Sequence, residues 1–276
     1  TVGLGLININ AVVDGIFATL VSDQAVRAID AAFRLYILPQ GVFSVAIATV
    51  LFPTIARMAA NRDFPGLRDS VASGLRQIFF LLLPASVFLM VLAEPVVRLV
   101  YQRGAFDAYS TLITSEALFF FTIGLVFNGA SLLLIRAFFS MQLPWLPTAI
   151  AGAGVLLNAG LNALLYQPLG VGGIPLATSI TSLVTFLLLV YYLSARTGGL
   201  DLRFVTVGFL QALGAAVFAG LLGWLAWWLL DTWLGTSLPA QLVSVGMGGA
   251  ATLVGIVAAA RAMNIPEMTA ILRVIS

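Results

Sequence analysis

Three pairs of polar side chains stand inside long apolar stretches, each pair spaced to share one face of a helix. The pairs are Asn10 and Asp14, Asn158 and Asn162, and Thr178 and Ser182. An ionised carboxylate inside a membrane segment needs a partner, water or a bound cation. Asp14 together with Asn158, Asn162 and Thr178 offers one carboxylate and several neutral oxygens, a ligand set that suits a hard monovalent cation. Hydrogen bonds that only hold helices together are the alternative interpretation.

A single arginine, Arg34, leads into an apolar run that ends at Pro53. A guanidinium at the mouth of a membrane helix is costly, and its planar fork matches phosphate oxygens two at a time. The position is compatible with a side chain that reaches the interface, and also with an anion contact facing a cavity. A phosphate-bearing substrate is the functional interpretation.

The sequence contains no grouping typical of an enzyme. It has no cysteine and no histidine, which removes thiol chemistry, the usual zinc ligands and a histidine proton relay. No phosphate-binding loop, dinucleotide fingerprint or nucleophile elbow is present. We therefore expect no enzyme activity and no cofactor. Transport would be driven by an ion gradient, the membrane potential or the substrate gradient, and Na⁺ or H⁺ is the candidate coupling ion.

The composition is that of a polytopic all-α membrane protein. Of the 276 residues, 61% are hydrophobic and only 9% charged, whereas soluble domains are about a quarter charged. The absence of period-2 alternation argues against a barrel. Eight transmembrane helices are predicted, near 2–21, 36–57, 76–100, 111–135, 145–166, 173–194, 207–230 and 240–261. The charged stretch 22–35 is expected to form an amphipathic or re-entrant turn.

The arginines, which are the only basic residues, predict the topology. If the first helix starts in the cytoplasm, nine arginines fall in the inner connections and four in the outer ones. This asymmetry follows the positive-inside rule and places both ends in the cytoplasm. Because these charges lie at helix ends, no nucleic-acid partner is expected. The first helix follows Thr1 directly without the pattern of a signal peptide, so we interpret the chain as part of a longer protein with an even number of preceding helices.

Several motifs occur in an order and spacing that resemble the MurJ (MviN) family of lipid II flippases, within the multidrug/oligosaccharidyl-lipid/polysaccharide exporter superfamily. They are residues 10–14 (NAVVD), 34–39 (RLYILP), 45–53 (VAIATVLFP), 103–107 (RGAFD), 136–138 (RAF), 168–170 (PLG) and 174–179 (IPLATS). The resemblance implies a fourteen-helix protein with two six-helix lobes. This chain would supply the second lobe (1–195), then two additional helices and a short cytoplasmic tail (196–276).

The resemblance also implies a function and its residues. Such proteins move a lipid-linked peptidoglycan precursor across the bacterial inner membrane by alternating access, which serves cell-wall synthesis and cell shape. Arg34 matches the cavity arginine expected to contact the precursor's pyrophosphate, and the two additional helices would line a groove for the polyprenyl tail. Asp14, Asn158, Asn162 and Thr178 match a cation site, although Asn162 stands where an acidic residue is common.

The expected partners are therefore lipid II, membrane lipid and the first lobe of the same protein. Three alternatives stay open: a related polysaccharide-lipid flippase, a drug/cation antiporter, and a scaffold that organises cell-wall proteins without transport.

Overall fold

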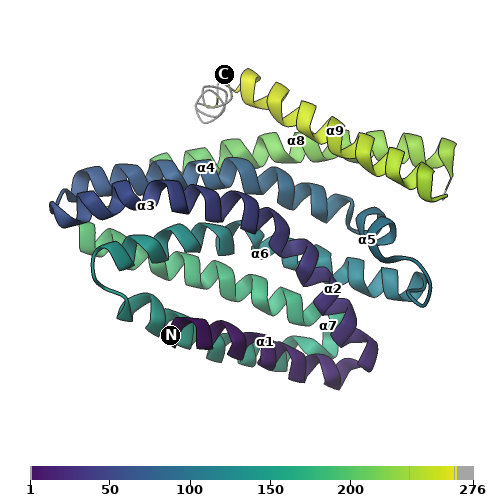
Figure 1. The fold of residues 1–276 in the computed structure, drawn as a ribbon, viewed down its shortest axis with the longest axis horizontal. Helices are drawn as coiled ribbons and strands as arrows, with labels where there is room; N and C mark the ends of the chain where they lie inside the picture. The colour runs from purple at the N-terminus through teal and green to yellow at the C-terminus, as the bar shows by residue number, and fades with distance from the viewer. Residues whose placement is uncertain (1, 236, 264, 266–276) are drawn as a thin grey trace.

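The computed structural model describes residues 2–235, 237–263 and 265, with side chains from Asn10 onward. The regular structure within these ranges is helical throughout (Figure 1). The helices are α1 (Val2–Val21), α2 (Asp23–Pro39), the π-helix η1 (Gln40–Ser44), α3 (Val45–Ala60), α4 (Phe64–Val91), α5 (Ala93–Tyr101), α6 (Ala108–Ser140), α7 (Trp145–Thr197), α8 (Leu202–Leu234) and α9 (Leu238–Ala262).

The long helices run back and forth along one axis, as in a bundle that crosses a membrane. The connections 61–63, 141–144 and 198–201 lie at one end, and those at 102–107 and 235 lie at the other (Figure 1). Six helical segments of the described chain are long and apolar enough to span a bilayer. One of them, α7, has 53 residues and reverses direction at Gly170, so it supplies two passes. Together with α1 this gives the eight predicted passes, and the polytopic helical fold is confirmed.

The expectation of a re-entrant turn at 22–35 is wrong. Ser22 caps α2, accepting a hydrogen bond from the backbone N–H of Ala25 at 3.0 Å. From Asp23 the chain stays helical to Ala60, passing through η1 without a loop. The predicted amphipathic character of this stretch is confirmed. The small residues at positions 25, 28 and 32 are buried, whereas residues 24, 30 and 34 are exposed.

The predicted helix at 76–100 is two helices. Pro95 has no backbone N–H to donate to the carbonyl of Val91 four residues earlier, so the helix cannot run straight through. Accordingly α4 ends at Val91 and the short α5 begins at Ala93, with Leu92 between them at φ −107° and ψ 27°.

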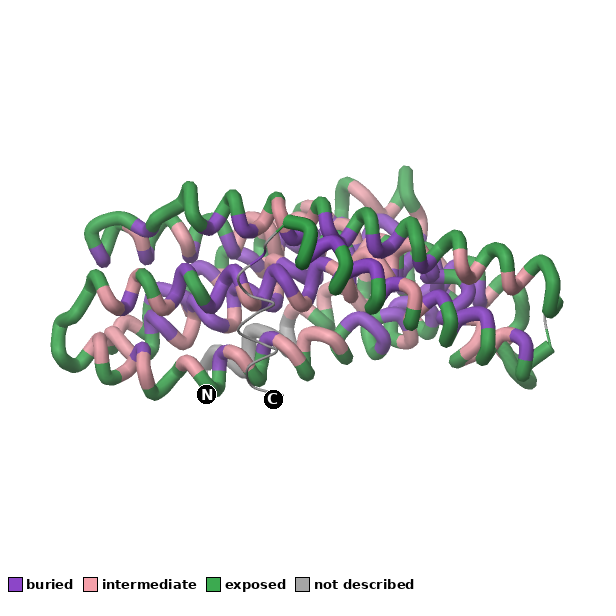
Figure 2. Tube along the Cα trace, turned by 90° about the horizontal axis from the view of Figure 1, so that it is seen from above, coloured by how far each residue is buried: buried purple, intermediate pink, exposed green. Residues whose placement is uncertain are grey.

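The last two helices form an antiparallel pair that packs on α4 (Figure 1). One face of α8 makes this contact through small residues, and Ala212 and Ala216 are almost fully buried. Gly220 lies so close to Val87 of α4 that a Cβ there would overlap that side chain. Figure 2 shows the buried positions along the inside of the bundle and the exposed ones around it, the burial pattern of helices packed around an apolar interior.

Candidate functional site

Four of the predicted polar residues meet in one cluster between α1 and α7. The side-chain amide nitrogen of Asn162 donates to Asp14 Oδ1 at 2.7 Å and to Asn158 Oδ1 at 3.1 Å. The hydroxyl of Thr178 lies 3.2 Å from Asp14 Oδ2 and 3.3 Å from the amide nitrogen of Asn158. Both asparagines are fully buried. The other members of the three pairs stay outside: Ser182 donates to the carbonyl of Thr178 within its own helix.

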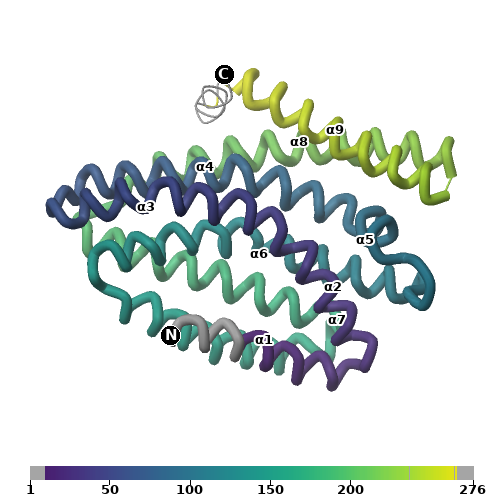
Figure 3. Tube along the Cα trace, in the orientation of Figure 1, coloured from purple at the N-terminus to yellow at the C-terminus, as the bar shows by residue number. Residues whose placement is uncertain are grey.

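The reversal at Gly170 is what builds this cluster. Gly170 adopts φ 52° and ψ −126°, a backbone conformation that side chains with a Cβ rarely accept. Asn162 stands eight residues before Gly170 and Thr178 eight residues after it, so the turn brings the two side chains to the same depth. Gly173 completes the close crossing, because a Cβ there would overlap the carbonyl of Leu165. Helix α1 lies alongside α7 and adds Asp14 (Figures 1 and 3).

The oxygen atoms of the cluster could hold a monovalent cation. The Oδ1 atom of Asn162 is buried and has no hydrogen-bond partner among the described residues, and neither has Oδ1 of Asn10, one turn before Asp14. A buried amide oxygen without a partner is costly in an apolar setting. Rotation of the Asn162 amide would turn this oxygen toward the Asp14 carboxylate and the Asn158 oxygen. Asp14 is the one carboxylate among the four residues of this cluster, so a single carboxylate supplies its charge. The described residues contain no group of three or more His, Cys, Asp or Glu side chains that could hold a metal ion.

Arg34 lies on α2, which supplies no residue to the polar cluster, and its side chain is 71% exposed. Its Nε donates to Asp30 Oδ2 at 3.0 Å, and Nη2 is 2.9 Å from the same oxygen. A guanidinium has five N–H donors, so the ion pair leaves donors available to an anion. The structure therefore presents Arg34 on an open face of a membrane helix, where an incoming group can reach it.

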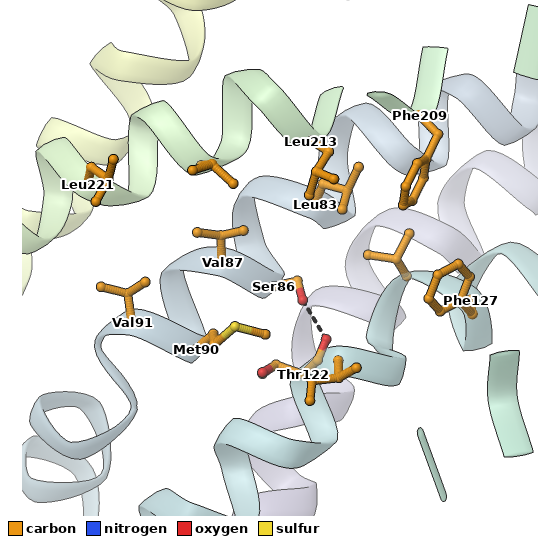
Figure 4. A pocket seen from close by; sticks show the side chains of 13 residues that line it. Leu83, Ser86, Val87, Met90, Val91, Thr122, Phe127, Phe209, Leu213 and Leu221 are labelled. Carbon is orange, nitrogen blue, oxygen red and sulfur yellow. Dashed lines mark hydrogen bonds between the residues drawn. The ribbon is translucent and has the colours of Figure 1, made fainter. Parts of the chain in front are cut away.

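An apolar cavity of about 360 Å³ lies between α4, α6 and α8 (Figure 4). Its α8 wall is a single helix face, formed by Phe209, Leu213, Val217 and Leu221. The hydroxyl of Ser86 donates to the carbonyl of Thr122 at 2.5 Å, so this polar group in the lining is satisfied. The cavity thus offers an apolar surface that suits a hydrocarbon chain.

Two polar contacts made by α2 were not predicted from the sequence. The first is Asp30, whose i,i+4 spacing to Arg34 was a readable signal for an ion pair. The second is a cross-helix contact in which Asn128 of α6 donates to the hydroxyl of Tyr36 at 2.9 Å. A polar residue inside the apolar run 111–135 was the available signal for it.

Comparison with known proteins extends these observations. The family model described as "Lipid II flippase MurJ" matches residues 1–244. A probable lipid II flippase MurJ of Rhizobium meliloti is 30% identical over 260 residues, covering 94% of this chain and 47% of that protein. One from Synechocystis sp. is 27% identical over 224 residues, covering 81% of this chain and 42% of that protein. The chain therefore spans about half the length of these curated relatives.

Among solved structures, a lipid II flippase MurJ in an inward closed conformation matches 95% of this chain and 52% of its own, with 25% identity and a TM-score of 0.74. An outward-facing multidrug resistance MATE family transporter matches with 16% identity and a TM-score of 0.62, a likeness of fold alone. The fold is thus that of a transporter of the MOP superfamily, a class of multi-pass membrane proteins. Within that class, the chain belongs to the MurJ family of lipid II flippases.

Proposed function

We propose that this chain forms the second lobe (1–195) and the additional helix pair (196–276) of a flippase that carries lipid II from the inner to the outer leaflet. The observation that carries the proposal is an arginine exposed on a membrane helix, in a chain of the MurJ family. The protein would act by alternating access in the bacterial cytoplasmic membrane. Both ends of this segment would lie in the cytoplasm, since that orientation places nine of thirteen arginines inside.

Arg34 would bind the pyrophosphate of the precursor. Its ion pair with Asp30 engages Nε and Nη2, and a pyrophosphate with several negative oxygens can compete for the same fork. Both partners are largely exposed. In a water-filled cavity, water would weaken their mutual attraction and exchange would cost little. A lysine could supply the charge but not the paired hydrogen bonds.

The cavity between α4, α6 and α8 would take part of the polyprenyl tail. It is lined by branched and aromatic side chains, and the hydroxyl of Ser86 is already satisfied by a backbone carbonyl. The additional helix pair contributes one wall of this cavity through α8. This pair would therefore hold the lipid tail, whereas the two lobes would make the alternating-access movement.

The cluster around Asp14 would bind the coupling ion, Na⁺ being the ion that its oxygens suit. Asp14, Asn158, Asn162 and Thr178 would hold it, and the ion would supply only positive charge between α1 and the two arms of α7. Asp14 of α1 bonds to Asn162, before the Gly170 reversal, and to Thr178, after it. These hydrogen bonds therefore depend on how α1 packs on both arms of α7. Proton coupling through Asp14 is the alternative, and sodium titration separates the two.

Complementation tests the proposed function. The full reading frame would be expressed, as wild type and as Arg34→Ala, in a bacterium depleted of its own lipid II flippase. We expect the wild type to restore growth and the equally abundant Arg34→Ala variant to fail. A wild type that inserts normally but does not restore growth would contradict lipid II as substrate and favour another lipid-linked sugar or a scaffold role.

A further inference from the structure

The helical rod formed by α2, η1 and α3 contains a break in its backbone hydrogen bonding. Pro39 has no N–H, so the carbonyl of Leu35 loses its donor four residues ahead. Directly afterwards, the N–H of Val45 bonds to the carbonyl of Gln40, a five-residue spacing that widens the helix into a π-turn. The rod bends in this region (Figures 1 and 3). A proline followed by a π-turn is a recognised cause of such a bend.

Side chains from both sides of the break are tied to one residue of α6. The amide nitrogen of Asn128 donates to the hydroxyl of Tyr36 at 2.9 Å, and the side-chain nitrogen of Gln40 donates to Asn128 Oδ1 at 3.4 Å. Tyr36 is 1% exposed and its ring lies 5.3 Å from that of Phe121. Asn128 therefore bridges the last turn of α2 and the first residue of the π-turn.

Two polar atoms at the same break are left without partners. Gln40 Oε1 and Ser44 Oγ are buried and make no hydrogen bond among the described residues. Gly129 of α6 lies against Ser44 so closely that a Cβ would overlap its hydroxyl. Unsatisfied polar groups in an apolar layer raise the energy of the present arrangement. A second arrangement of the rod that satisfies them would compete with it, which is the property of a two-state hinge.

We propose that Asn128 is a positioning residue that latches a hinge at Gln40–Ser44 and so sets the direction of the segment that carries Arg34. Arg34 stands two residues before Tyr36, on the part of the rod that the latch holds. Releasing the latch lets α2 swing against α3 and moves the guanidinium with it. The consequence for Arg34 rests on the proposed function, whereas the hinge itself does not.

Distances between spin labels test the hinge without any substrate. This chain has no cysteine, so labels can be placed in it at Gln24→Cys and Ala60→Cys, exposed positions on the two sides of the hinge. The full-length protein would be measured in nanodiscs, with any cysteine outside this chain replaced by serine. A second pair at Tyr109→Cys and Phe139→Cys spans α6 as a control for folding. The latch variants are Asn128→Leu and Tyr36→Phe. Ser131→Ala is the matched control, because Ser131 is a buried polar residue of α6 that bonds only to its own helix.

We expect each latch variant to add a second distance population for the 24–60 pair, while the 109–139 pair stays unchanged. The double variant should resemble Asn128→Leu alone, because Asn128→Leu already removes the Asn128–Tyr36 hydrogen bond that Tyr36→Phe breaks. An unchanged single population in Tyr36→Phe and Asn128→Leu would overturn the hinge. The same second population in Ser131→Ala would also overturn it, since general loosening would then explain the result.

Retention of lipid II in native mass spectrometry tests the positioning role separately. Latch variants should reduce the lipid-bound fraction several-fold, although they leave Arg34 itself intact. Full retention in variants that open the hinge, when Arg34→Ala loses the lipid, would overturn the positioning role. If Arg34→Ala retains the lipid as well, the proposed pyrophosphate contact fails while the spin-label result still decides the hinge.

Discussion

Asp30 and Arg34 form an ion pair on the exposed face of α2, with Asp30 Oδ2 lying 3.0 Å from Nε and 2.9 Å from Nη2. The carboxylate occupies part of the fork that would bind pyrophosphate, so Asp30 acts as an internal competitor. Asp30→Asn should tighten binding of a pyrophosphate lipid. Arg34→Ala should weaken it by about tenfold or more, since a charge-assisted hydrogen bond contributes about 1.5–3 kcal/mol. Binding of lipid II measured by native mass spectrometry checks both, and weaker binding by Asp30→Asn would contradict the competition.

Asp14 supplies the charge of the polar cluster, and Asn162 is the neutral residue bonded to it. Asn162→Asp would place a second carboxylate beside Asp14, and two carboxylates attract a cation more strongly than one. The variant should show a larger rise in melting temperature with added NaCl, relative to choline chloride, than the wild type. Asp14→Asn should show none beyond the choline control. Equal salt effects in all three proteins would argue against a sodium site and favour a structural cluster.

Asp107 caps α6 and makes the start of this helix sensitive to acid. The backbone N–H of Ser110 donates to its carboxylate at 2.8 Å, and this bond, with the Ser110 side chain, holds the pKa of Asp107 below its usual range. A lowered folded-state pKa means that the stabilisation is complete above the unfolded pKa near ~3.9 and is lost as the pH falls through the folded value. Hydrogen exchange at 108–112, corrected for intrinsic rates, should therefore accelerate in the wild type below about pH 4.

Asp107→Asn is the matched variant for this prediction, because an asparagine also caps a helix but carries no titrating charge. Its exchange at 108–112 should depend less on pH over the same range. Identical profiles for the two proteins would show that another group controls the start of α6.

The contact between α8 and α9 depends on Gly223. A Cβ at this position would overlap the Thr252 hydroxyl and lie 2.8 Å from the carbonyl of Gly248, a backbone atom that cannot give way. Gly223→Ala should therefore destabilise the pair by about 1–3 kcal/mol, the usual cost of overpacking. Gly246→Ala is the control on α9, since no atom lies within 4 Å of its Cβ. It should be neutral or stabilising by up to about 1 kcal/mol.

Thermal unfolding in a mild detergent measures both glycine variants. A Gly223→Ala protein as stable as Gly246→Ala would contradict the close packing of α8 on α9.

The sequence was sufficient to predict the eight passes and the members of the polar cluster. The length of each apolar stretch predicts one pass through the membrane. A carboxylate in an apolar helix needs polar side chains near it, which points to the asparagine and threonine residues of the other apolar helices. The convergence of Asp14 with Thr178 was not predictable, because it depends on the angle of the reversal at Gly170 and on how α1 lies against α7. The role of these residues as cation ligands stays a prediction.

The structure of residues 22–44 could not be predicted fully from the sequence. Their charges suggested a surface turn, yet Ser22 caps a helix and small residues let α2 pack against α6. The π-turn at Gln40–Ser44 has no local sequence signature beyond the preceding proline. Its partner Asn128 is 88 residues away from Gln40, so only the tertiary fold reveals the contact.

Translocation of lipid II across the bilayer of proteoliposomes tests whether Arg34 binds the substrate during transport. The full-length protein would be compared as wild type, Arg34→Ala, Arg34→Lys and the control Arg27→Ala, an arginine two turns earlier on α2. We expect transport by the wild type and Arg27→Ala, partial transport by Arg34→Lys and none by Arg34→Ala, with all four equally inserted. Undiminished transport by Arg34→Ala would contradict the proposed contact between Arg34 and the pyrophosphate.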